Sequence, residues 1–83
     1  MSALTVDVVA PDRTLWSGKA DSVSAPAMDG DMGLLPGHES VLAQLRPGTV
    51  RVHAGEEHKE FPVTSGFLSF DDNVVTVIVG GLG

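Results

Sequence analysis

The chain contains no cysteine, and only five of its 83 residues are lysine or arginine. The lack of cysteine excludes a disulfide framework and thiolate chemistry. The basic residues are scattered singly and the formal net charge is −6, so the clustered cations that neutralise nucleic-acid phosphates are missing. We therefore expect no nucleic-acid partner.

Long apolar segments are also missing. The longest apolar run, residues 74–79, is short and contains Thr76, whereas a membrane-spanning helix needs about 20 consecutive apolar residues. The amino end lacks the charged and apolar regions of a secretory signal. We expect no direct membrane insertion. The length predicts one domain over residues 1–79, followed by a disordered tail over 80–83 that has nothing to pack.

No stretch keeps the period of 3.6 residues that an amphipathic helix requires. Alternation of apolar and polar residues instead predicts strands, as at Leu4, Val6 and Val8. The predicted strands cover residues 4–10, 14–17, 19–25, 49–53, 58–63, 67–70 and 74–79. Many short strands separated by turns indicate an all-β fold, a two-sheet antiparallel β-sandwich or flattened barrel.

Local details of this fold follow from turn chemistry. We expect the second and third strands to form a hairpin through Ser17 and Gly18, with Gly18 ending the second strand. Residues 71–73 join the last two strands, because Asp and Asn tolerate the left-handed conformation. The aromatic side chains predicted to fill the core are Trp16, Phe61, Phe67 and Phe70.

Residues 30–48 hold four glycines and two prolines, which exclude a long helix. Their apolar runs are short enough for a brief strand or a single helical turn. We interpret the stretch as a stiff, irregular loop held by apolar anchors. Such a loop projects Asp31, His38 and Glu39 from a rigid scaffold, where function is expected.

Motifs of enzyme and cofactor chemistry are missing from the sequence. The histidines, His38, His53 and His58, lack the spacing of metal ligands within one strand or helix. No nucleophile elbow, Walker loop or dinucleotide-binding glycine pattern occurs. The sequence therefore predicts no catalytic, cofactor-binding or metal-binding residues.

Two non-enzymatic functions are left. One is a small all-β carrier domain of the lipoyl or biotinyl kind, which presents a modified lysine at a hairpin tip; Lys19 and Lys59 are the candidates, although neither has that setting. The other is a binding module. In that case Asp29 and Asp31 beside Gly30 could meet a basic partner.

The central stretch carries a family resemblance. Gly-Asp-Met-Gly-Leu-Leu-Pro-Gly-His at residues 30–38, with Leu42, Leu45 and the following Pro-Gly, resembles the signature of the epsilon subunit of the rotary ATP synthase. Residues 6–13 with Trp16, Ser17 and Gly18 are similar to the first hairpin of that family. Residues 65–70, Asn73 and residues 75–77 are similar to its last one.

The resemblance implies a β-sandwich that is not catalytic by itself. It implies a central-stalk role on the cytoplasmic face of the inner (plasma) membrane, where the domain binds the gamma subunit and the ring of c subunits and couples rotation to ATP synthesis. By the same resemblance, Asp29, Asp31 and Met32 are expected to face the c ring. Likewise His38, Ala43 and Ser65 are expected to face gamma.

The sequence also departs from the family pattern. Ser40 stands where the family usually has proline, and Ser65 where it usually has glycine, which makes the backbone there less permissive. The pair of carboxy-terminal helices that restrains ATP hydrolysis in the family is not in these 83 residues. From this we expect coupling without helical inhibition or ATP sensing.

Overall fold

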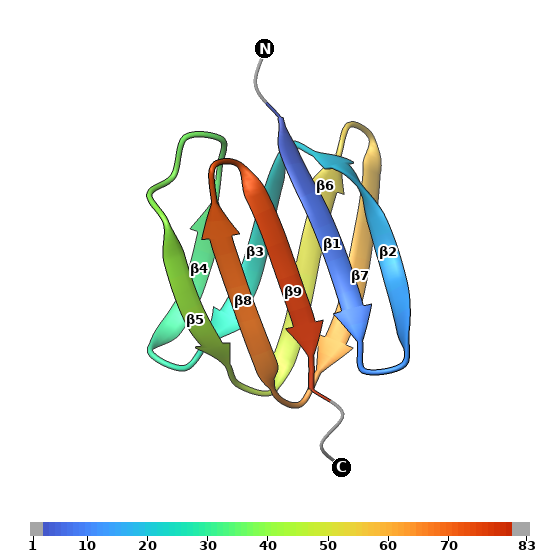
Figure 1. Ribbon diagram of the computed structural model, residues 1–83, viewed down its shortest axis with the longest axis vertical. Coiled ribbons are helices and arrows are strands. Elements are labelled where there is room, and N and C mark those ends of the chain that lie inside the picture. Colours follow the sequence, from blue (N-terminus) through green and yellow to red (C-terminus); the bar gives the residue numbers. More distant parts are fainter. Residues whose placement is uncertain (1–2, 81–83) are drawn as a thin grey trace.

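A computed structural model describes residues 3–80, and every regular element within that range is a β-strand (Figure 1). The strands are β1 (Leu4–Ala10), β2 (Arg13–Ala20), β3 (Ser22–Ala27), β4 (Gly30–Leu34), β5 (Val41–Leu45), β6 (Gly48–Ala54), β7 (Glu57–Val63), β8 (Gly66–Asp71) and β9 (Val74–Val79). The all-β prediction is confirmed. Of the expected tail, residues 81–83 lie outside the described range, while the Gly80 N–H donates to the Ser65 carbonyl at 2.8 Å.

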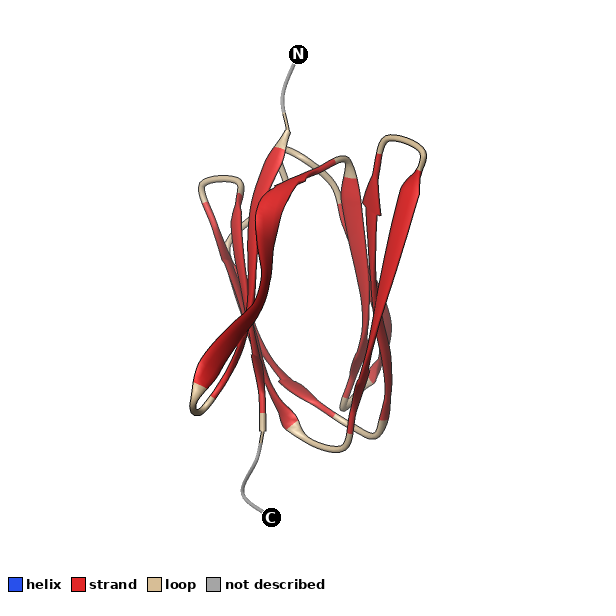
Figure 2. Ribbon diagram, turned by 90° about the vertical axis from the view of Figure 1, so that its right-hand side faces the viewer, coloured by secondary structure: helices blue, strands red, loops and turns tan. Residues whose placement is uncertain are grey.

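The strands form two facing layers, which Figure 2 shows edge-on. One layer has the order β2-β1-β9-β8-β5, and the other has β4-β3-β6-β7. A single pairing, between Ala27 of β3 and Leu45 of β5, joins the layers along one side. The sandwich is not wholly antiparallel, because β1 and β9 run parallel.

The chain passes between the layers at a sharp corner after β5. On the two sides of this corner, the Arg46 N–H donates to the Pro26 carbonyl at 2.9 Å and the Met28 N–H donates to the Gln44 carbonyl at 2.8 Å. At Gly48, a Cβ atom would lie 2.8 Å from Cβ of Pro26, so this position needs glycine. The prediction that residues 30–48 form one irregular loop is therefore wrong. They form two edge strands, the loop of residues 35–40 and this corner.

The core lies between the layers. Strand alternation directs Leu4, Val6 and Val8 from one layer toward Val50 and Val52 of the other, and all five are fully buried. Burying each such side chain stabilises the fold by roughly 1.5–3 kcal/mol. No buried side-chain polar atom within residues 3–80 lacks a hydrogen-bond partner. The inward positions predicted by alternation are confirmed.

Two aromatic residues account for differences from the predicted strands and core. Strand β2 continues through Gly18 and pairs with β1, so the expected hairpin between the second and third strands is wrong. Gly18 makes room for Trp16, since a Cβ at Gly18 would lie 3.0 Å from the indole ring. Phe67 is not a core residue, because 49% of its surface is exposed.

Candidate interaction surfaces

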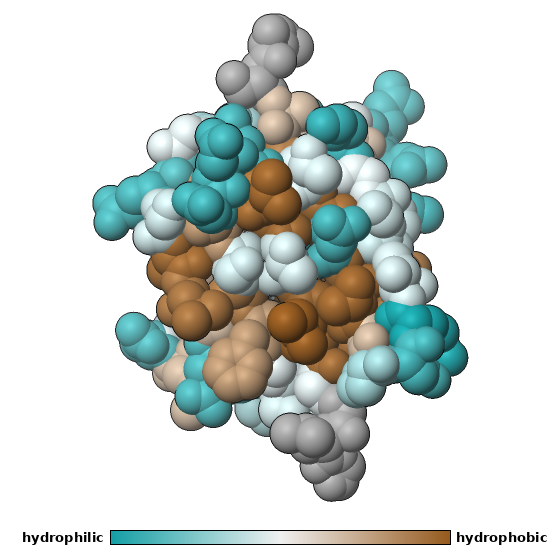
Figure 3. All heavy atoms as spheres, viewed as in Figure 1, coloured by the Kyte–Doolittle hydropathy of each residue, from teal (hydrophilic) through white to brown (hydrophobic). Residues whose placement is uncertain are grey.

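Large apolar side chains lie on the outer face of strands β5, β8 and β9 in the β2-β1-β9-β8-β5 layer. Leu42, Phe67, Val74 and Ile78, which we call the apolar face, are 74%, 49%, 42% and 45% exposed. Phe67 and Ile78 are direct cross-strand partners on β8 and β9, and Leu42 lies diagonally from Phe67 on β5. Figure 3 shows hydrophobic surface gathered on this side of the molecule. The outward pair Ser69 and Thr76 separates Val74 from Phe67 and Ile78, so the cluster of Leu42, Phe67 and Ile78 is the part of this face that is typical of a protein-binding surface.

A shallow depression of about 440 Å³ adjoins Phe67 and Ile78. Its other lining residues are Pro11, Gln44, Ser65, Gly66, Val79 and Gly80. Gly66 holds a φ of 145°, and a Cβ there would lie 2.1 Å from the Ile78 carbonyl oxygen. Gly66, and not its neighbour Ser65, therefore carries the backbone conformation that only glycine adopts easily. The Ser65 departure leaves this turn intact.

An acidic turn lies at the same end of the sandwich (Figure 1). Met28 and Asp29 connect β3 to β4 and are both exposed. Asp31, on β4, accepts a hydrogen bond from Arg46 Nη2 at 2.7 Å, whereas Asp29 makes no ion pair within residues 3–80. The two aspartates expected to face the c ring therefore differ: one is compensated within the chain and the other presents its full charge.

A groove of about 450 Å³ runs between this turn and strand β5. Asp29, Asp31 and Met32 line one side, and Leu42 and Ala43 line the other. Met32 also packs against the core. The groove thus brings the three residues expected to face the c ring next to Ala43, which was expected to face gamma.

The residues expected to face gamma do not form one patch. Ser65 lies in the depression beside the apolar face, and Ala43 lies in the groove. His38 lies at the other end of the sandwich, where its ring packs edge-on against Phe70 at 5.4 Å between centroids. Its Nδ1 bonds to the Glu39 carbonyl at 2.7 Å.

Sequence reasoning missed the exposed members of the apolar face. The available signal was strand β9, in which Val74 and Ile78 alternate with the inward residues Val75 and Val77. A strand with apolar residues on both faces indicates that its outer face is also to be covered. Residues 3–80 contain no group of three or more histidine, aspartate or glutamate side chains placed to hold a metal ion. Within the same range, no helix is long and apolar enough to span a membrane.

The family described as "ATP synthase, Delta/Epsilon chain, beta-sandwich domain" matches residues 3–81 of the sequence. The chain belongs to this family. The signature stretch of the epsilon resemblance corresponds to β4, the following loop, β5 and the corner. Ser40, which departs from the family pattern, donates from its hydroxyl to Asp71 Oδ1 at 2.6 Å and so ties the loop to β8.

Individual relatives carry the epsilon name. The chain is 46% identical over 76 residues to the ATP synthase epsilon chain of Hydrogenovibrio crunogenus, covering 92% of this chain and 53% of that one. It is 44% identical over 77 residues to the epsilon chain of Synechococcus elongatus, covering 93% and 56%. The chain therefore spans about half the length of these relatives.

Solved structures share the fold. A chain of the Euglena gracilis mitochondrial ATP synthase, from a structure of OSCP, F1 and the c ring, superposes with a TM-score of 0.88 at 23% identity, covering 95% of this chain and 51% of that one. A chain from the central stalk and c ring of the Tetrahymena thermophila mitochondrial ATP synthase gives 0.80 at 17% identity, covering 95% and 64%. At these identities the likeness establishes the β-sandwich fold.

Proposed function

We propose that this domain is a non-catalytic part of the central stalk of the proton-translocating ATP synthase. There it binds the gamma subunit and the c ring and couples ring rotation to ATP synthesis on the cytoplasmic face of the inner (plasma) membrane. The observation that carries the proposal is the exposed apolar face, which ends beside an acidic turn. A coupling element needs two such surfaces, one for each partner.

The apolar face is the surface we assign to gamma. Phe67 exposes an aromatic side chain of the kind enriched in protein interfaces, and Leu42 and Ile78 add apolar area beside it. The adjoining depression can receive a side chain of the partner, with Ser65 at its rim. Strands hold these side chains, so little conformational entropy is lost when gamma binds.

The β3–β4 turn is the surface we assign to the c ring. Asp29 presents a free carboxylate, and Met28 and Met32 offer flexible apolar contacts beside it. The net charge of −6 favours an encounter with basic loops. Charge of this kind sets orientation and association rate more than final affinity.

The carrier-domain alternative has less support. Lys19 lies within β2, where its Nζ donates to Thr5 Oγ1 at 2.8 Å. Lys59 lies within the edge strand β7 and is partly buried. A lysine that receives a lipoyl or biotinyl group has to project freely from a hairpin tip. A mass increase at Lys19 or Lys59 after expression in the native host would favour the carrier-domain alternative over the proposed function.

The proposal is tested by capture and cross-linking. The purified domain is mixed with gamma from the same source, and the recovered complex is mixed with c rings. Because the sequence has no cysteine, single cysteines at Phe67 and Asp29 give unambiguous cross-links. We expect the cysteine at position 67 to capture gamma and the one at position 29 to capture c subunits.

A matched control uses the hairpin tip between β6 and β7. Glu56 is exposed there, at the end of the sandwich away from the β3–β4 turn (Figure 1). A cysteine at Glu56 is expected to cross-link neither partner. Absence of gamma binding at micromolar concentration, or equal cross-linking from all three positions, would contradict the proposed role.

A further inference from the structure

Two histidines face each other across the β6–β7 hairpin. His53 and His58 are direct cross-strand partners, and the hairpin turn consists of Gly55 and Glu56. Gly55 has a φ of 65°, which suits the first position of a two-residue hairpin turn. Both rings extend from the outer face of the β4-β3-β6-β7 layer, because the inward positions of β6 are Val50 and Val52.

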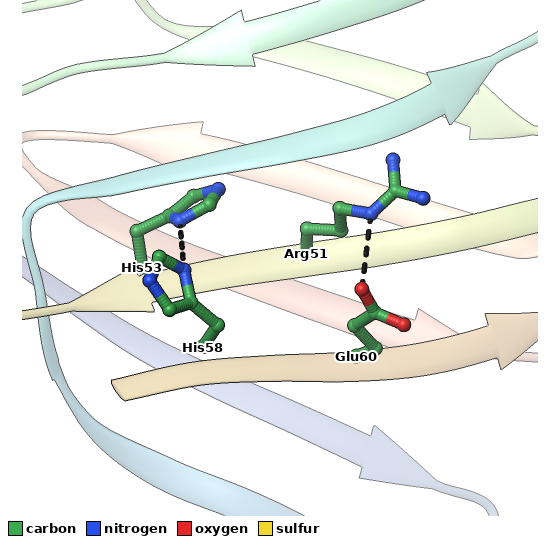
Figure 4. A network of polar contacts seen from close by, with 4 residues as sticks. All are labelled: Arg51, His53, His58 and Glu60. Carbon is green, nitrogen blue, oxygen red and sulfur yellow. Dashed lines mark hydrogen bonds and ion pairs between the residues drawn. The ribbon is translucent and has the colours of Figure 1, made fainter. Parts of the chain in front are cut away.

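The two Nδ1 atoms lie 2.6 Å apart, and the rings meet at 83° with their centroids 4.7 Å apart (Figure 4). A contact this short needs one proton between the nitrogens, so one ring donates and the other accepts. The hydrogen bond directs the lone pair of one Nδ1 at the other Nδ1, so both nitrogens lie within reach of a single ion once the proton between them has left. Neutral imidazole nitrogen is also the commonest metal ligand in proteins.

We propose that His53 and His58 form a binding site for a divalent transition-metal ion of tetragonal preference, Cu²⁺ or Ni²⁺. Two nitrogens at about 2.05 Å from a metal are about 2.9 Å apart when they bind at a right angle and about 3.3 Å apart in a tetrahedral site. The nitrogens are hydrogen-bonded at 2.6 Å, so they have to separate less to reach the right-angled arrangement than the tetrahedral one; Cu²⁺ and Ni²⁺ favour the right-angled arrangement. Water completes the remaining positions.

Metal binding requires only a small change in the pair. The donating ring carries its proton on Nε2 instead of Nδ1, so both Nδ1 lone pairs face the ion and no net proton is lost from neutral rings. When the rings are protonated, each releases one proton to solvent on binding. The nitrogens separate by a few tenths of an ångström and both rings turn so that their lone pairs face the ion, which side chains on the outer face of a hairpin end permit.

The surroundings of the pair favour a cation. On the same face, the nearest arginine, Arg51, donates from Nε to Glu60 Oε2 at 3.3 Å and is thereby compensated (Figure 4). On the neighbouring strand, Ser22 lies opposite His53 and adds no charge. Asp21 holds the turn through a 2.8 Å bond from the Gly55 N–H, so its carboxylate lies at this end as well.

The site is independent of the surfaces proposed for gamma and the c ring, since it lies on the other layer and away from the β3–β4 turn. Residue spacing along a single strand or helix does not reveal the pair of His53 and His58. The register of the hairpin brings these residues, five positions apart, into contact. Binding here would fasten the outer end of the edge strand β7 to β6.

The test is a titration of the metal-free protein with Cu²⁺ or Ni²⁺ at about pH 8, because metal ions bind deprotonated ligands. We expect one ion per chain by calorimetry and a visible ligand-field band. The variants His53→Gln and His58→Gln should each lower the affinity about tenfold or more, as expected for loss of a ligand. The matched control, His38→Gln, changes the third histidine and should bind as the wild type does.

Two further measurements make the result independent of how the variants fold. Broadening of amide signals by Cu²⁺ in the wild-type protein should be confined to the β6–β7 hairpin and to Ser22 beside it. Affinity should fall as the pH is lowered, because protons compete with metal ions for imidazole nitrogen. Binding that is unchanged in both His53→Gln and His58→Gln, or broadening elsewhere, would overturn the proposal and leave the pair as a hydrogen bond only.

Discussion

Arg46 and Asp31 join the corner between the layers to the edge strand β4 through a 2.7 Å hydrogen-bonded ion pair. The arginine side chain is 38% exposed and the aspartate side chain 82% exposed. The pair lies next to the groove that Asp29 and Met32 also line. Arg46 therefore sets how much of the acidic charge at this end is available to a partner.

Replacing Arg46 with alanine should release the Asp31 carboxylate without unfolding the domain. Because the pair is exposed, the free energy of unfolding should fall by less than about 1 kcal/mol. If basic c-ring loops meet this end, association should become faster at low salt and more salt-dependent. Stopped-flow association with c rings at several salt concentrations measures this.

The control for that experiment is Arg51→Ala. Arg51 is also an exposed arginine paired with a carboxylate, but it lies on β6 opposite Glu60. It should lower stability by a similar small amount and leave the c-ring association rate unchanged. Equal effects of the two variants on the rate would mean that only the net charge of the domain matters.

Substitutions at two leucines test the inner and outer faces of one layer separately. Leu68 is fully buried and Leu42 is 74% exposed. Leu68→Ala should cost about 2–5 kcal/mol in the free energy of unfolding, because it leaves a cavity in the core. Leu42→Ala should change stability by less than about 0.5 kcal/mol.

The same two variants test whether the apolar face binds gamma. Leu42→Ala should weaken gamma binding about tenfold, which corresponds to roughly 1.4 kcal/mol. Calorimetric titration with gamma and denaturant unfolding, run on both variants, give the two quantities. If Leu42→Ala bound gamma as tightly as the wild type, gamma would have to contact another surface.

Much of this fold could be predicted because strand alternation and turn residues agree along most of the chain. Strand β1 and the hairpin of β6 and β7 were predicted closely, and Asp72 and Asn73 hold the positive φ values of 50° and 64° that turn chemistry predicts. The topology could not be obtained this way. Alternation marks which residues share a face, but it does not say which strands become neighbours.

The errors have specific physical causes. The sequence predicts that Gly18 ends a strand, whereas in the structure Gly18 lies inside the strand and its lack of a side chain leaves room for the indole of Trp16. Phe67 was assigned to the core because burial is the usual place for phenylalanine. The apolar face depends on the pairing of β5, β8 and β9, and the acidic end depends on the contact of the corner with β4. No local pattern encodes these contacts.

Gly66→Ala should be the most damaging glycine substitution among those in the strands. The new Cβ would lie 2.1 Å from a backbone oxygen, and the φ of 145° is itself strained for alanine. We expect a loss of about 3 kcal/mol or more in the free energy of unfolding. Gly33→Ala is the control, since no heavy atom lies within 4 Å of its added Cβ. Thermal unfolding of both variants checks the difference.

Asn73 connects the β8–β9 turn to the loop of residues 35–40, and two substitutions at this position test its role. Its φ is 64°, and its side-chain oxygen accepts the Gly37 N–H at 2.7 Å. Asn73→Gly keeps the backbone conformation and removes this bond, so it should cost about 1 kcal/mol. Asn73→Ala also forces a Cβ into the left-handed region, which should cost about 1–2 kcal/mol more.

Hydrogen exchange at the Gly37 amide separates these two contributions. Exchange should accelerate in both Asn73 variants, because both lose the acceptor that holds the loop against β8 and β9. Asp72→Gly is the control: it relieves a positive φ of 50° at the neighbouring position and leaves the Asn73 bond in place. It should leave the exchange rate unchanged and stability equal or higher. If the Gly37 amide exchanged at the wild-type rate in all three variants, Ser40, through its bond to Asp71, would hold the loop without help from Asn73.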